Sequence, residues 1–281
     1  MRTVRTAAGL ADGISAWKAA GAKVAFVPTM GALHEGHLSL IGIARRHAPR
    51  VVASIFVNPT QFAPHEDFDS YPRHPERDAS LLKRAGCDLL FIPDREVVYP
   101  EGFGTWIEPQ GAALGLESDF RPHFFRGVAT VVARLFRLVL PDIAVFGEKD
   151  AQQLAVIRQL VRDLALPIEI VGGPTVREAD GLAISSRNVY LSADERRRAI
   201  RLSRALAQAR SLFDHGERQS APLRDCVRQE LAADPEIVVQ YVEVVDPDSF
   251  VPLSEVQHRA VVALAAKLGT TRLIDNIGLD D

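Results

Sequence analysis

The stretch VPTMGALHEGHLSLI, residues 27–41, decides how this chain is interpreted. An apolar run ends near a proline, two histidines follow three positions apart, and a new apolar periodicity begins directly after them. The first part is typical of a buried strand and the last part of a helix, so the histidines fall at the join between them. If the helix begins near His34, then His34 and His37 point to the same side of its first turn.

This join has the properties of a phosphate-binding site. The first turn of a helix leaves backbone N–H groups without intrahelical partners and carries partial positive charge. Gly31 and Gly36 allow a ligand to approach the backbone closely. Together with the two imidazoles, these features favour a site for a phosphate group.

Other interpretations of the histidine pair remain open on the local sequence. The spacing could suit zinc, but the HExxH pattern is absent and no third ligand is apparent. A Walker A loop would need GxxxxGK[ST], which occurs nowhere in the chain. The pair could also be a surface accident, which the local sequence alone does not exclude.

Composition predicts a cytoplasmic enzyme. The 281 residues suffice for one large domain or two modest ones, and the formal net charge of −3 gives no basic field for a nucleic-acid partner. Cys87 and Cys226 are too few for a disulfide framework and lack metal-site spacing, and Cys87 is expected in the core. No apolar run approaches the roughly 20 residues that span a bilayer, and no signal segment is apparent, so no membrane partner is expected.

Short β-branched runs alternate with helical patterns in the first part of the chain. This alternation predicts an α/β fold with a parallel sheet, helices on both faces, and ligands at the carboxyl ends of the strands. One predicted helix carries a buried stripe of Val128, Val131, Val132, Leu135, Phe136 and Val139. The predicted strands are 23–29, 50–59, 87–93, 141–150 and 167–173, and the predicted helices are 38–48 and 128–140.

The pattern changes near residue 176. A charged helix over 191–213, capped by Ser192, and a second helix near 221–233 are followed by two alternating strands. This is typical of a smaller α+β unit. The sequence therefore predicts a Rossmann-like domain over 1–176 and an α+β domain over 177–281, with the two strands at 237–246 and 259–268.

Three further segments place polar side chains where predicted strands or domains end. FGEKDAQQL (146–154) puts Lys149 beyond a strand, as a point charge for a phosphate. SIFVNPTQF (54–62) supplies amides that can orient a small polar substrate, and DGLAISSRN (180–188) groups two serines with an arginine. Each segment alone also fits an ordinary loop, but together they favour a nucleotide site.

These segments resemble those of a known family. VPTMGALHEGHLSLI, VNPTQF, EDFDSYPR, FGEKDAQQL and VREADGLAISSRN resemble, in the same order over about residues 24–190, the signatures of the pantoate–β-alanine ligases, or pantothenate synthetases. That family belongs with the class I aminoacyl-tRNA synthetase-like nucleotidyltransferases. His34–His37 resembles their HIGH motif, and Ile184–Arg187 stands where KMSKS would. The resemblance implies a Rossmann-like domain with a HIGH-type nucleotide site, binding ATP and pantoate, and a smaller C-terminal lid or flap domain.

The resemblance also implies an activity. ATP would activate pantoate as pantoyl adenylate with release of pyrophosphate, and β-alanine would then displace AMP to give pantothenate, in the coenzyme A pathway. Mg²⁺ would travel with the ATP phosphates, without a metal site made by the protein alone. A homodimer is implied by the family.

Site residues follow from the same resemblance. His37 would be the proton donor, and His34 and Lys149 the other catalytic residues. Gln61 and Gln153 would bind pantoate, Gln61 also touching β-alanine, and 184–187 would close over the triphosphate as a mobile flap. The ATP-binding residues would be Met30, Gly31, Ala32, Leu33, His34, Glu35, Gly36, His37, Gly147, Glu148, Lys149, Asp150, Val176, Ile184, Ser185, Ser186 and Arg187.

Two positions depart from the family pattern. Ile184 stands where many members have methionine, which leaves the polar Ser-Ser-Arg trio intact. The family's RPGHFRGV is RPHFFRGV here, so Phe124 occupies the histidine position and His123 lies one place earlier. No role is carried over to His123.

Other functions fit the chain less well. A second kind of adenylyltransferase, acting on a phosphorylated substrate, would need a further cationic cluster, whereas Gln61 and Gln153 suit an uncharged diol beside one carboxylate. A tRNA synthetase would need a basic RNA surface. A catalytically silent nucleotide-binding or scaffold protein would not require His34, His37, Lys149 and Arg187 together.

Overall fold

The computed structural model describes residues 1–64 and 66–280. Their contacts form two compact units, one of Met1–Glu148 with Val156–Pro174 and the other of Lys149–Ala155 with Thr175–Asp281. The boundary expected at residue 176 lies beside the break between Pro174 and Thr175, but the segment 149–155 groups with the later residues. The assignment of separate domains to 1–176 and 177–281 stays a prediction.

The first unit is built on a parallel sheet with the strand order β1-β4-β3-β2-β5-β6. This confirms the α/β class. The strands are β1 Arg2–Val4, β2 Val24–Thr29, β3 Arg50–Ile55, β4 Leu89–Phe91, β5 Ile143–Gly147 and β6 Glu169–Gly173. The helices before residue 175 are α1 Ala7–Ala19, α2 Glu35–His47, α3 Pro75–Arg84, α4 Arg95–Val98, α5 Glu117–Phe120, α6 Phe124–Val139 and α7 Ala151–Asp163, with short 3-10 turns η1 Pro59–Gln61, η2 Gly111–Ala113 and η3 Glu148–Asp150.

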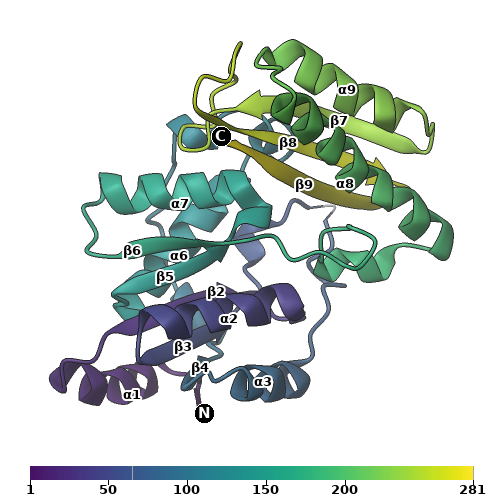
Figure 1. The fold of residues 1–281 in the computed structure, drawn as a ribbon. Helices are drawn as coiled ribbons and strands as arrows, with labels where there is room; N and C mark the ends of the chain where they lie inside the picture. Colours follow the sequence, from purple (N-terminus) through teal and green to yellow (C-terminus); the bar gives the residue numbers. More distant parts are fainter. Residues whose placement is uncertain (65, 281) are drawn as a thin grey trace. The chain divides into compact units, whose positions relative to one another are not determined.

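Helices cover both faces of this sheet because alternate residues of a strand point to opposite sides. Ala25 and Val27 of β2 share a core with α2, which lies across β2 and β3 in Figure 1. Phe26 points the other way and meets Phe136 of α6, with ring centroids 6.4 Å apart. The stripe predicted on α6 is confirmed, since all six of its members are buried.

The carboxyl edge of the sheet carries two of the segments that the sequence predicts to form the site. β2 and β3 pair in register as far as Thr29 opposite Ile55. The chain then leaves β2 for α2, and it leaves β3 for η1. The strand predicted over 50–59 therefore stops early, because Pro59 cannot donate to a ladder and Asn58 caps the 3-10 turn through its side chain.

The second unit packs two helices on an antiparallel sheet of order β7-β8-β9. Ser192 caps the longer helix, as the sequence predicted. Its Oγ accepts from the N–H of Glu195, and its own N–H donates to the Glu195 carboxylate, which makes a capping box. The strand β9 was not predicted. The elements are η4 Ser186–Tyr190, α8 Ala193–Asp214, α9 Ser220–Ala232, β7 Ile237–Val245, β8 Arg259–Leu268 and β9 Thr271–Asp280. Across the described part of the chain, no helix has the length and apolarity needed to cross a membrane.

Candidate functional site

The two histidines lie together at the start of α2. His34 is the N-cap residue, with extended backbone angles, and the helix begins at Glu35. The ring centroids of His34 and His37 are 4.1 Å apart, which confirms that both point to one side. The backbone N–H of His34 donates to Nδ1 of His37 at 3.4 Å, a long hydrogen bond that leaves the proton of a neutral His37 on Nε2.

The loop between β2 and α2 is held by a buried carboxylate. Asp78 of α3 is 1% exposed and accepts from the N–H of Ala32 at 2.8 Å and of Leu33 at 3.0 Å. Gly31 has a positive φ of +85°, and a Cβ there would meet Ile55 at 3.1 Å and Asp78 at 3.2 Å. Glycine is therefore needed at this position for both conformation and space.

Asp78 changes the expectation for the loop. Its two oxygens occupy the N–H groups of Ala32 and Leu33, so a phosphate would meet the first turn of α2 rather than the loop before it. Gly31, Ala32 and Leu33 are buried, whereas Met30, His34, Gly36 and His37 are half-buried and Glu35 is exposed. Sequence reasoning did not single out Asp78, although it lies just after the recognised segment EDFDSYPR.

Gln61 is fixed from three directions. Its side-chain oxygen accepts from Asn58 at 3.0 Å, and its Nε2 donates to the sulfur of Met30 at 3.1 Å. Its backbone carbonyl accepts from Arg121 at 2.9 Å. The structure thus brings Gln61 of η1 beside Met30, which immediately precedes the loop that leads to His34.

Arg121 is a further residue that sequence reasoning missed. It is 9% exposed, forms two 2.6 Å hydrogen bonds with the carboxylate of Glu66, and stacks on Phe124 with 3.8 Å from its Cζ to the ring centroid. Arg121 is the first residue of RPHFFRGV, the segment in which sequence reasoning considered only the displaced histidine. His123 is the exposed N-cap residue of α6, and Phe124 serves as a platform for Arg121.

Close packing on α6 holds Asn58 and the turn around it. A Cβ on Gly127 would lie 2.3 Å from the Thr60 carbonyl oxygen, so only glycine permits this approach of helix and turn. The Gly127 carbonyl accepts from Asn58 at 3.2 Å, and the Tyr99 hydroxyl donates to the Asn58 side-chain oxygen at 2.9 Å. Burial raises the pKa of Tyr99, and hydrogen bonds with Thr60 and Asn58 offset this only in part.

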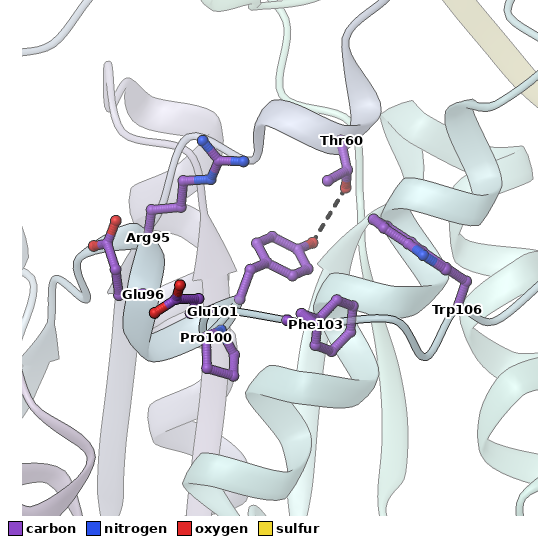
Figure 2. Close-up of a pocket in the computed structure, with 9 residues that line it drawn as sticks. Thr60, Arg95, Glu96, Pro100, Glu101, Phe103 and Trp106 are labelled. Atoms are coloured by element: carbon purple, nitrogen blue, oxygen red, sulfur yellow. Dashed lines mark hydrogen bonds between the residues drawn. The ribbon is translucent and has the colours of Figure 1, made fainter.

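A cavity of about 390 Å³ lies beside this turn. Figure 2 shows Thr60, Phe103 and Trp106 around it, and the dashed line marks the hydrogen bond between the hydroxyl groups of Thr60 and Tyr99. The two aromatic rings are 5.4 Å apart between centroids and meet edge to face. Neither histidine lines the cavity. Its lining includes Tyr99, which donates to the Asn58 side chain that in turn holds Gln61.

The second unit holds the other group of predicted residues. Lys149 lies in η3 directly after β5 in the chain, and its carbonyl accepts from the side chain of Asn276 at 2.9 Å. The N–H of Ile184 donates to the carbonyl of Val176 at 3.0 Å. Ser185 caps η4, with its Oγ accepting from the N–H of Arg187 at 3.3 Å.

The predicted site residues are therefore divided between the two units. Within the first unit the structure pairs Gln61 with Met30 and His34 with His37, and it places Gly147 and Glu148 at the end of β5. The second unit carries Lys149, Asp150, Gln153, Val176, Ile184, Ser185, Ser186 and Arg187. Within residues 1–64 and 66–280, no group of three or more His, Cys, Asp or Glu side chains is arranged to hold a metal ion.

Comparison with known proteins identifies the family. The family profile described as Pantoate-beta-alanine ligase matches residues 2–278. A pantothenate synthetase of Thermoanaerobacter sp. is 51% identical, with 92% of each chain covered, and that of Caulobacter vibrioides is 50% identical, with 98% of each covered.

Solved structures agree with these sequence matches. The crystal structure of pantothenate synthetase from Thermus thermophilus superposes with a TM-score of 0.93 at 50% identity over 100% of both chains. A pantoate–β-alanine ligase from Francisella tularensis, complexed with βγ-ATP and β-alanine, gives a TM-score of 0.79 at 33% identity over 99% of this chain and 97% of that one. The chain belongs to the pantoate–β-alanine ligase family, the pantothenate synthetases.

Proposed function

We propose that this enzyme joins pantoate and β-alanine in two steps. In the first step a pantoate carboxylate oxygen attacks the α-phosphorus of ATP, and the bond to the β-phosphate oxygen breaks with release of pyrophosphate. In the second step the amine of β-alanine attacks the acyl carbon of pantoyl adenylate, loses a proton, and expels AMP. Activation is needed because a free carboxylate is a poor acyl donor to an amine.

One observation carries this proposal. The imidazoles of His34 and His37 lie together at the first turn of α2, directly beyond the carboxyl end of β2. A helix start at the edge of a parallel sheet favours an anion, and two imidazoles can supply protons to it. His37 with its Nε2 proton would donate to the phosphate oxygens as pyrophosphate leaves, and His34 would stabilise the charge on the α-phosphate.

The remaining residues take positioning roles in the proposal. Gln61 would hold pantoate and meet β-alanine, since its side chain is fixed between Asn58 and Met30. Gln153, half-buried on α7, would share the pantoate site. Lys149 would supply positive charge to the phosphates, and Ile184–Arg187 would close over them as a flap. The wider set from Met30 to His37, with Gly147 to Asp150 and Val176, would line the nucleotide.

ATP and β-alanine as substrates are supported by the ligands named for the Francisella tularensis relative. Mg²⁺ would be held by phosphate oxygens and water, because it keeps several waters and prefers substrate phosphates to an all-protein cage. It would neutralise charge on the departing pyrophosphate. Association as a homodimer and a cytoplasmic location complete the proposal, and light scattering of the purified chain tests the first of these.

The decisive experiment is isotope exchange. The enzyme is incubated with ATP, Mg²⁺ and labelled pyrophosphate, with pantoate present and β-alanine absent. A two-step reaction predicts label in ATP under these conditions, and Gln153→Ala should reduce that exchange along with overall synthesis. Exchange that requires β-alanine would show a concerted three-substrate reaction and contradict the adenylate.

A further inference from the structure

Two adjacent residues of β9 anchor two segments that lie far away in the sequence. Asn276 donates from its side chain to the carbonyl of Lys149 at 2.9 Å. Asp275, which is 3% exposed, pairs with Arg177 through hydrogen bonds of 2.7 and 2.9 Å. Because neighbouring residues of a strand point to opposite faces, one short piece of β9 can bind partners on both sides.

Arg177 extends this network to the start of the predicted flap. It donates to the carbonyl of Gly181 at 3.1 Å and to the backbone carbonyl of Asn276 at 3.1 Å. It also forms an isolated antiparallel bridge with Ala183. The residues from 177 to 183 therefore form a small hairpin whose return arm leads straight into Ile184.

We propose that Asp275, Asn276 and Arg177 are positioning residues for the phosphate-binding groups, acting on Lys149 and on the base of the 184–187 segment. The inference rests on the roles proposed above for Lys149 and Arg187. None of the three is proposed to touch substrate. Asn276 fixes the peptide at the start of α7, and the Arg177–Asp275 pair fixes the hairpin.

Anchoring the backbone matters because the charged groups of Lys149 and Arg187 lie at the ends of long side chains. Lysine carries its charge on a flexible four-carbon stem, so the position of the ammonium depends first on where the backbone is held. Misplacement of a catalytic group by about 1 Å can cost about 100-fold in rate. One backbone hydrogen bond to Lys149 and one buried ion pair at the hairpin restrict both segments before ATP binds.

The position of β9 in its sheet supports this assignment. β9 ends the order β7-β8-β9, so its outer backbone groups are open to partners other than a strand. The carbonyl of Asn276 uses this edge to accept from Arg177. A charged residue buried within a strand costs stability unless it is paired, and the carboxylate of Asp275 accepts from both terminal guanidinium nitrogens of Arg177.

The test compares Asn276→Ala with Gln240→Ala. Asn276 is half-buried, so its truncation should leave the fold intact, and Asn276→Ser serves as a second variant if it does not. Gln240 is the matched control, because it is an amide of the same sheet that bonds a side chain, Arg272, at 2.6 Å. That hydrogen bond involves neither Lys149 nor the hairpin, so its loss should leave every measured activity within about twofold of wild type.

Two activity measurements separate positioning from stability. In Asn276→Ala, the KM for ATP should rise by about tenfold, and the rate of pantoate-dependent pyrophosphate exchange should fall by about tenfold. Ligation of β-alanine to pantoyl adenylate supplied directly should change by less than about threefold, because that step no longer needs the pyrophosphate side of the site. Equal losses in both half-reactions, or no loss in either, would overturn the proposal.

Hydrogen–deuterium exchange tests, independently of catalysis, whether these hydrogen bonds restrict the two segments. In the absence of substrates, Asn276→Ala should speed exchange in the segment 149–155 while leaving β7 unchanged, and Asp275→Asn should do the same for 176–187. If the wild-type enzyme shows no pyrophosphate exchange, the proposed function fails while this measurement still decides the network. Unchanged exchange in these segments would remove the positioning role.

Discussion

The carboxylate of Asp78 holds the backbone of Ala32, with 2.8 Å between Oδ2 and the amide nitrogen. Its other oxygen accepts from the N–H of Leu33, so one side chain of α3 fixes the loop that connects β2 to α2. His34 follows immediately. The placement of the histidine pair therefore depends on a residue that itself lies outside the segment 27–41.

Asp78→Asn should lower turnover by about 10- to 100-fold, because the amide group would face an N–H donor where an oxygen now accepts. Steady-state rates and a thermal melt of the same preparation measure the effect. Asp142→Asn is the control, since Asp142 accepts from the N–H of Val24 at 2.7 Å at the opposite end of β2. Equal rate losses in the two variants would assign Asp78 to stability alone.

His37→Ala should lose about 10²- to 10⁴-fold in turnover with little change in stability, because His37 is half-buried and its proposed role is to supply a proton. Turnover and melting temperature give the two readings. His47→Ala provides a comparison, as an exposed histidine at the other end of the same helix. Near wild-type turnover in His37→Ala would exclude it from the mechanism.

Lys149→Ala and Arg187→Ala should each weaken adenylation more than pantoate binding, because the proposed role of both charges is to bind the ATP phosphates. Single-turnover release of pyrophosphate measures the first quantity, and equilibrium binding of pantoate the second. The exposed residues Lys267 and Arg197 supply alanine controls of the same charge. A variant of Lys149 or Arg187 that releases pyrophosphate at the full rate would contradict its assignment.

Cys87 should make the protein lose stability in alkali. Burial raises the pKa of its thiol from 9.0 to about 12, while backbone hydrogen bonds lower it only in part. Above pH 9 the unfolded chain loses this proton and the folded chain keeps it, so the free energy of unfolding falls as pH rises toward 12. The stabilisation is complete below pH 9.

Urea unfolding at about pH 8 and about pH 10.5 tests this effect. Between those values wild type should lose about 2 kcal/mol more than Cys87→Ala, which has no thiol to titrate. At the lower pH the same thiol should react slowly with alkylating reagents, because it is buried and protonated. An equal loss of stability in the two proteins would show that Cys87 does not contribute.

The sequence by itself determined the features that depend on neighbours along the chain. Each of these features is encoded by residues close together in the chain: strand β2, the start of α2 near His34, the stripe on α6 and the N-cap Ser192. Their signals are periodicity and capping, which do not require knowledge of the fold. The family resemblance rests on the same kind of local information.

Only the tertiary structure decided which distant residues support the site. Asp78 meets the loop before α2 from 45 and 46 positions away, and Asn276 meets Lys149 across 127. Such partners depend on strand order and helix packing, which no local pattern contains. β9 illustrates the limit: the alternation of buried residues along it places Asp275 at a core position, and a carboxylate there hides the strand from any hydrophobic pattern. That carboxylate is tolerated only because the fold brings Arg177 to it.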